Sequence, residues 1–88
     1  MNKQEILQQA ISTYGAQTQE MMLLEEMSEL QKEICKHWRG RDNTRAIAEE
    51  IADVEIMLEQ MKMIFRCAYT VSLYRFQKLK RLERRLSE

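Results

Sequence analysis

The chain has 88 residues, with fourteen basic and fourteen acidic side chains and no net charge at neutral pH. This length fits one small domain over residues 1–88, and because a core of this size is marginal by itself, we expect self-association. The charge balance argues against a protein that coats a nucleic acid polymer or an anionic membrane surface. Any function based on charge must therefore be local.

The sequence predicts a cytoplasmic protein without a membrane segment. Its first ten residues, MNKQEILQQA, lack the apolar stretch of a signal peptide, and no run approaches the roughly 20 apolar residues that span a bilayer. Two cysteines are too few for a disulfide framework and lack C-x-x-C spacing. We therefore expect Cys35 and Cys67 to be reduced thiols.

Helix-forming residues dominate the whole chain. Proline is absent, and Gly15 and Gly40 are the only glycines, so few positions end a helix by local chemistry. The composition predicts an all-α fold, with helices over about 3–13, 17–38, 44–66 and 71–86.

Two of the predicted breaks differ in strength. In RGRDN (39–43), Gly40 can end a helix in the left-handed conformation, and Asn43 or Asp42 can cap the next helix. This break has the length of a helical hairpin, so we expect antiparallel helices on either side of it. The break near CAYT is weaker, with Thr70 or Ser72 as the candidate cap.

Apolar residues recur at helical spacing in the last three predicted helices. These stripes predict the core of the hairpin and, in the last helix, a face that can pair with a partner helix. One hairpin leaves apolar surface uncovered, so we expect a four-helix-bundle-like core built by a homodimer or homotetramer. The stripes are Leu23, Met27, Leu30 and Ile34; Ile47, Ile51, Val54, Leu58 and Met61; and Leu73, Phe76, Leu79, Leu82 and Leu86.

Two pairs of carboxylates flank the stripes of the hairpin. Glu26 and Glu29 lie about 60 to 130° to one side of the first stripe. Glu50 and Asp53 lie to one side of the second stripe in the same rotational sense. In an antiparallel pair both sets emerge on the same side, at heights that differ by about one helical turn. We therefore predict a cluster of four carboxylates.

Such a cluster requires a counter-charge. Like charges four residues apart, such as Glu25 with Glu29 and Glu49 with Asp53, destabilise an isolated helix. Mg²⁺ or Mn²⁺ would neutralise the cluster, since both ions take oxygen ligands. Zinc is disfavoured because His37 is the only histidine. The alternative is that these carboxylates are ordinary solvated side chains.

Two acidic motifs, EEMSE (25–29) and EIAD (50–53), form the pattern E-E-x-x-E followed by E-x-x-D. This pattern resembles the signature of the all-α nucleoside triphosphate pyrophosphohydrolases, the MazG-like family, which is related to dimeric dUTPases and phosphoribosyl-ATP pyrophosphohydrolases. The stretch YGAQTQEMMLLEEMSEL resembles the lead-in of small MazG-like proteins, and AEEIADVEIMLEQM resembles the second metal helix of the family. The resemblance covers roughly residues 10–65.

The resemblance implies an activity and a ligand set. Members of the family cleave the bond between the α- and β-phosphates of a nucleoside triphosphate, releasing a monophosphate and pyrophosphate. By resemblance, the ligands of Mg²⁺ or Mn²⁺ are Glu26, Glu29, Glu50 and Asp53. Glu25 or Glu29 would then orient or deprotonate the attacking water.

The candidate substrate contacts lie outside these motifs. Lys78 and Arg81 roughly match the family's basic residues in the last helix, where six basic and two acidic residues over 70–88 give a net charge of +4. They would bind phosphates or, alternatively, pack against the acidic helices. Trp38 could stack on a nucleobase or serve as a packing anchor, and Tyr14 stands where relatives often have tryptophan.

Two other classes of function compete with an enzyme. One is a metal-dependent nucleotide-binding sensor that does not hydrolyse its ligand. The other is a structural oligomerisation module, in which the acidic residues pair with the basic last helix.

Overall fold

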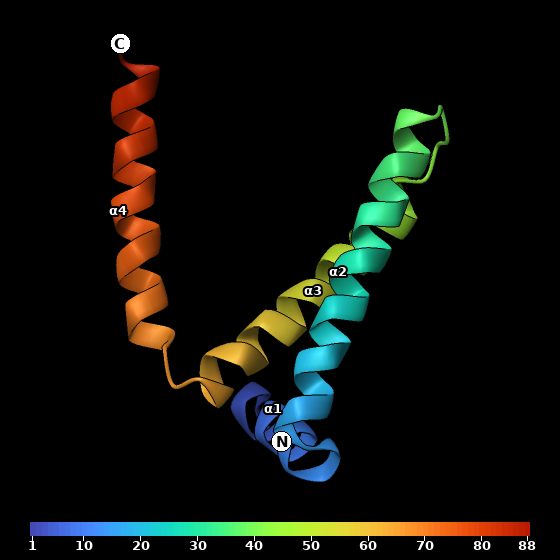
Figure 1. Cartoon of the computed structure of the whole chain (residues 1–88), viewed down its shortest axis with the longest axis vertical. Helices are drawn as coiled ribbons and strands as arrows, with labels where there is room; N and C mark the ends of the chain where they lie inside the picture. The colour runs from blue at the N-terminus through green and yellow to red at the C-terminus, as the bar shows by residue number, and fades with distance from the viewer.

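The computed structural model describes residues 1–88 and contains four helices and no strand (Figure 1). This confirms the predicted all-α fold. The helices are α1 (Lys3–Tyr14), α2 (Ala16–Trp38), α3 (Thr44–Ile64) and α4 (Ala68–Leu86). The predicted end of α3 was two residues too late, and the predicted start of α4 three residues too late. None of the helices combines the length and the apolar character needed to cross a bilayer.

Both ends of α1 are set by neighbouring residues, a capping box at the start and a glycine at the end. The Asn2 side chain accepts a hydrogen bond from the Glu5 backbone N–H at 2.8 Å, while the Glu5 carboxylate accepts one from the Asn2 N–H at 3.5 Å. This reciprocal capping box satisfies two of the free N–H groups at the start of the helix. At the other end Gly15 has φ 93°, a conformation that favours glycine, and the chain turns there into α2.

The turn between α2 and α3 has the predicted left-handed glycine. Gly40 has φ 98°, its N–H donates to the His37 carbonyl at 2.9 Å, and the Arg41 N–H donates to the Lys36 carbonyl at 3.1 Å. These two bonds form a Schellman closure, which satisfies the last carbonyls of α2. Asn43 stands at the N-cap of α3, as predicted, but its side chain makes no capping hydrogen bond, because its amide reaches back to α2.

The break between α3 and α4 uses the same closure without a glycine. Arg66 has φ 50°, its N–H donates to the Met63 carbonyl at 3.3 Å, and the Cys67 N–H donates to the Lys62 carbonyl at 3.0 Å. The left-handed region costs a non-glycine residue about 1 kcal/mol. The predicted caps, Thr70 and Ser72, were wrong because α4 already begins at Ala68.

The four helices form an open V (Figure 1). α2 and α3 pack along each other as an antiparallel hairpin, and α1 packs on both; α4 contacts only α3, near their junction. The radius of gyration is 16.0 Å, whereas a compact domain of this length has about 12 Å. Only four residues are buried, namely Leu7, Gln19, Met57 and Gln60. A single chain therefore encloses very little core.

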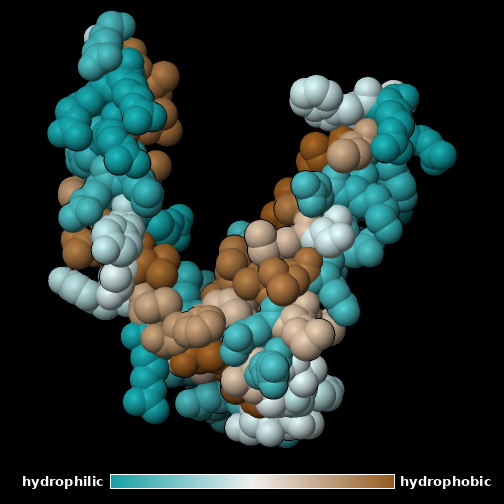
Figure 2. Space-filling view, viewed as in Figure 1, coloured by the Kyte–Doolittle hydropathy of each residue, from teal (hydrophilic) through white to brown (hydrophobic).

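Apolar side chains line both arms of the V. They gather on the side of α4 that faces the hairpin and on the side of the hairpin that faces α4 (Figure 2). Leu79 on α4 is 62% exposed and Met27 on α2 is 48% exposed. The prediction that the hairpin stripes are core was therefore only partly right, because each stripe is split between the helix contact and the surface. In the two stripes together, the half-buried residues are Leu23, Leu30, Ile47, Val54 and Met61, and the exposed residues are Met27, Ile34, Ile51 and Leu58.

Candidate metal centre

The contact between α2 and α3 contains three polar levels, spaced seven residues apart along α2. A spacing of seven residues returns a side chain to nearly the same edge of a helix. Gln19, Glu26 and Glu33 occupy this edge of α2. The side chains at these levels therefore take part in the contact between the helices, although Asp53 of the middle level is exposed.

The first level is a buried pair of amides. The Gln19 Nε2 donates to the Gln60 Oε1 at 2.7 Å, and the two residues are 6% and 3% exposed. The Gln60 amide also lies 3.9 Å from the Met57 sulfur. Because buried amides are costly without partners, this bond favours one alignment of α2 against α3.

The third level joins Glu33 to the start of α3. The Asn43 Nδ2 lies 2.9 Å from both the backbone carbonyl and the Oε1 of Glu33, and donates to each. The Lys36 Nζ donates to the Glu33 Oε2 at 3.0 Å. The bonds from Asn43 and Lys36 hold the pKa of the Glu33 carboxyl below its ordinary value of 4.5.

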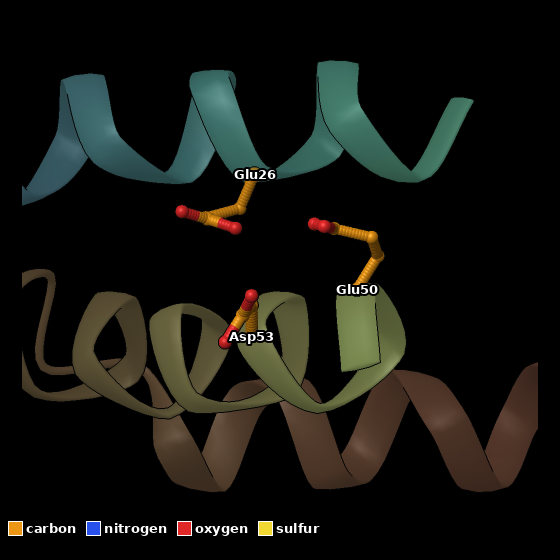
Figure 3. A group of neighbouring side chains, drawn as sticks. All are labelled: Glu26, Glu50 and Asp53. Atoms are coloured by element: carbon orange, nitrogen blue, oxygen red, sulfur yellow. The ribbon is translucent and has the colours of Figure 1, made fainter. Parts of the chain in front are cut away.

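The middle level has three carboxylates and no donor. Glu26 points from α2 towards α3, and Glu50 and Asp53 point from α3 towards α2 (Figure 3). One oxygen from each residue lies within 4.8 Å of the others. The Glu50 Oε2 is buried and has no hydrogen-bond partner. Desolvation, together with the negative charges of Asp53 and Glu50, raises the pKa of Glu26.

This donor set fits a hard divalent cation. The three side chains offer only oxygen atoms, which Mg²⁺ and Mn²⁺ prefer, and Mg²⁺ commonly binds through few carboxylates and several waters. The unpartnered buried oxygen of Glu50 is the group that a cation at this position would satisfy. We therefore define Glu26, Glu50 and Asp53 as the carboxylate triad.

The fourth predicted ligand, Glu29, is not part of the triad. It follows Glu26 by three residues, a rotation that places it about 60° around α2 from that side chain. The Glu29 carboxylate is instead 3.7 Å from the Lys32 ammonium, at the surface. Glu25 and Glu29 do share a surface hollow of about 500 Å³ with Glu26. Both predicted catalytic residues therefore lie beside the triad, on the solvent side of α2.

The predicted substrate contacts are not brought to the triad within one chain. Lys78 and Arg81 share a separate hollow of about 300 Å³ on α4, a helix that makes no contact with α2. Tyr14 and Trp38 flank the two ends of α2 and are 63% and 85% exposed. Trp38 ends α2 twelve residues after Glu26, about 18 Å away along the helix, whereas Tyr14 ends α1 before the turn at Gly15.

Sequence reasoning missed the amide residues at the ends of the polar series. Gln19, Gln60 and Asn43 were not among the candidate site residues, although Gln19, Glu26 and Glu33 are separated by seven residues each. That spacing was the signal available in the sequence. It indicates a polar edge on a helix whose partner cannot be read from local patterns.

The third level predicts a pH dependence of stability. Because the pKa of Glu33 is lower in the folded chain than its ordinary value of 4.5, the ionised carboxylate stabilises the fold above that value. This contribution is lost as the pH falls through the folded pKa. We expect Glu33→Gln to lower the free energy of unfolding at pH 7 and to approach the wild type in acid, as measured by urea titrations across pH 2–7.

The exposed residue Glu55 on α3 provides the control for this measurement. Glu55→Gln makes the same chemical change away from the three levels, and we expect it to follow the wild type at every pH. A difference between Glu33→Gln and the wild type that stays constant into acid would contradict the assignment.

No family model, curated protein or solved structure matches the chain. The likeness to the MazG-like family therefore rests on the acidic motifs and their flanking sequence.

Proposed function

We propose that this chain is a Mg²⁺-dependent pyrophosphohydrolase that converts a nucleoside triphosphate to a monophosphate and pyrophosphate, with Mn²⁺ as an alternative cation. The observation that carries the proposal is the middle polar level of the hairpin. The levels on either side contain amide donors, whereas Glu26, Glu50 and Asp53 face one another without any donor. The E-E-x-x-E and E-x-x-D motifs supply the reaction class by resemblance.

Each acidic residue has a role in this reaction. The triad would hold the cation, which would neutralise charge on the phosphate oxygens and polarise the phosphorus centre. Glu25 or Glu29, on the adjacent surface of α2, orients the water or accepts its proton. The oxygen of water forms a bond to the α-phosphorus. The bond between the α-phosphorus and the oxygen that bridges to the β-phosphorus breaks, and pyrophosphate leaves with the electron pair of that bond. Because Glu29 lies at the surface beside the triad, its position favours a role in activating water over a role as a ligand of a cation between the helices.

The proposal includes a second copy of the chain. The open shape and the four buried residues leave apolar faces on both arms of the V, and a homodimer or homotetramer would cover them in a four-helix-bundle-like core. Charge favours contact between α4 and a partner's hairpin. Residues 70–88 contain six basic and two acidic side chains, whereas residues 20–59 contain eleven acidic and five basic ones. Lys78 and Arg81 would then reach phosphates bound at the triad of the partner.

A nucleotide panel tests the reaction. The protein is incubated with ordinary and modified nucleoside triphosphates and Mg²⁺ or Mn²⁺, and the products are separated by ion-exchange chromatography. We expect monophosphate and pyrophosphate in equal amounts for at least one nucleotide, and no product after EDTA treatment. Release of orthophosphate and a nucleoside diphosphate would contradict cleavage between the α- and β-phosphates.

Binding measurements with the same cations and nucleotides, set beside the turnover results, separate the alternative functions. Binding of metal and nucleotide without turnover would favour the sensor. Absence of metal binding, nucleotide binding and turnover would favour the structural module, in which the triad has no ligand.

A further inference from the structure

We infer that the two outer polar levels, Gln19 with Gln60 and Glu33 with Asn43, fix the register of α2 against α3 and thereby position the carboxylate triad. The amide-bearing side chains are positioning residues, since none of them belongs to the triad. The register role concerns the hairpin alone. Its consequence for metal binding rests on the proposed function.

The spacing of the levels ties the amides to the triad. Gln19 precedes Glu26 by seven residues, and Gln60 follows Asp53 by seven. Seven residues correspond to about 10 Å along a helix. The 2.7 Å bond between Gln19 and Gln60 therefore sets Glu26 level with Asp53.

The other outer level repeats this relation on the far side of the triad. Glu33 follows Glu26 by seven residues, and Asn43 precedes Glu50 by seven. The bonds of 2.9 Å from the Asn43 amide to Glu33 hold this end of the hairpin in register. The triad is thus bracketed at nearly equal distances by two directional contacts.

Apolar packing alone does not select this register. The apolar residues between the helices recur every three or four positions, and hydrophobic attraction has no direction. A slip by one turn, about 5.4 Å, would again bring apolar residues together. It would also separate Gln19 from Gln60 inside the contact, leaving two buried amides without partners, and move Glu26 away from Asp53.

The burial of the amide pair supports a role in specificity. Gln19 and Gln60 are two of the four buried residues in the chain, places where apolar side chains would bury more favourably. A polar residue in the contact between two helices can specify their register at a cost in stability. That cost is explained if alignment of the carboxylates is what the pair secures.

The test replaces both amides at once. Gln19→Leu with Gln60→Leu keeps the size of the side chains and leaves no unpartnered polar group, so the variant is expected to fold. The matched control is Gln17→Leu with Gln31→Leu, the same change at two exposed positions of α2. The register is measured by pulsed EPR as the distance between spin labels attached at Ser28→Cys and Arg45→Cys. Cys35 and Cys67 are replaced by serine so that only these two positions carry a label. Labelled chains are diluted with unlabelled ones so that distances within one chain dominate.

The labels lie at different heights on α2 and α3, so a slip changes their separation. We expect one narrow distance distribution in the labelled parent and in the control, and a shifted or broadened one in the Gln19→Leu/Gln60→Leu variant. The Mn²⁺ affinity of that variant, measured by EPR of free Mn²⁺, is expected to fall by at least about tenfold, as for residues that orient metal ligands.

The outcomes separate this inference from the proposed function. An unchanged distance distribution overturns the register role, whatever the metal does. A changed distribution with unaltered Mn²⁺ affinity overturns the positioning role. A changed distribution supports the register role even if the parent protein binds no Mn²⁺, and that result would instead overturn the proposed metal site.

Discussion

Neutralising two members of the triad, by Glu26→Gln with Asp53→Asn, is expected to stabilise the metal-free protein and to abolish metal binding. The three carboxylates face one another without a donor, and burial and charge already raise the pKa of Glu26. Removing two negative charges relieves this repulsion, whereas amide oxygens do not replace carboxylates as ligands of a hard cation.

The two effects have opposite signs, and thermal unfolding with and without Mn²⁺ separates them. Each relieved like-charge contact is worth a few tenths of a kcal/mol, and 1 kcal/mol corresponds to about 4–8 °C in a domain of this size. The metal-free variant should therefore melt a few degrees higher, and Mn²⁺ should no longer raise its Tm. Pyrophosphate release should fall by more than about 100-fold, since even residues that only orient metal ligands contribute 10–100-fold.

A control with the same chemistry is available at exposed positions. Asp42→Asn with Glu55→Gln removes the same number of charges from the same residue types outside the triad. We expect this control to keep its stabilisation by Mn²⁺ and its turnover. Metal-dependent stabilisation that survives in the Glu26→Gln/Asp53→Asn variant would contradict the assignment of the triad.

The second large effect is expected from Leu79→Glu with Leu82→Glu on α4. Both leucines are exposed in the single chain, at 62% and 48%, and belong to the apolar stripe of α4. If a second copy covers this side, each subunit loses two buried leucines worth about 2 kcal/mol each. We expect the dissociation constant of the oligomer to rise by more than about 1000-fold, measured by sedimentation velocity over a concentration series.

The control for charge adds two glutamates on the opposite side of α4. Thr70 and Gln77 are exposed and lie about 120–180° around α4 from Leu79 and Leu82, so Thr70→Glu with Gln77→Glu adds two glutamates away from those leucines. This variant should assemble like the wild type. Retention of the oligomer by the Leu79→Glu/Leu82→Glu variant would show that the apolar side of α4 is not the interface.

Local chemistry explains which breaks the sequence predicted well. Gly40 marks the hairpin turn because glycine favours the left-handed conformation that the closure requires. The equivalent closure at Arg66 could not be predicted in the same way, because an arginine carries no such preference. Its conformation is set by how α3 ends and α4 begins, and the predicted boundaries were wrong at that junction.

The site was predicted in part for a similar reason. Glu26, Glu50 and Asp53 could be grouped because regular helices and an antiparallel hairpin place them at similar heights. Glu29 was grouped with them because the sequence does not show which edge of α2 faces α3. That edge is marked by Gln19, whose hydrogen bond to Gln60 joins residues 41 positions apart and so lies beyond any local pattern.

The apolar stripes show what hydrophobic periodicity can predict about burial. Their periodicity predicted which residues avoid water, but it carries no information on whether the cover comes from the same chain. The exposure of Met27, Ile34, Ile51 and Leu58 shows that helix contacts within one chain cover only part of each stripe.

The backbone conformation of Arg66 makes α4 a lever arm. Its nineteen residues extend about 28 Å from that joint, and α3 is the only helix that α4 contacts. A rotation of about 20° at the joint would sweep the far end of α4 through about 10 Å, as follows from the rise per residue. The dihedral angles of Phe65, Arg66 and Cys67 thus set the direction of α4, and small changes at this junction displace its far end by several ångströms.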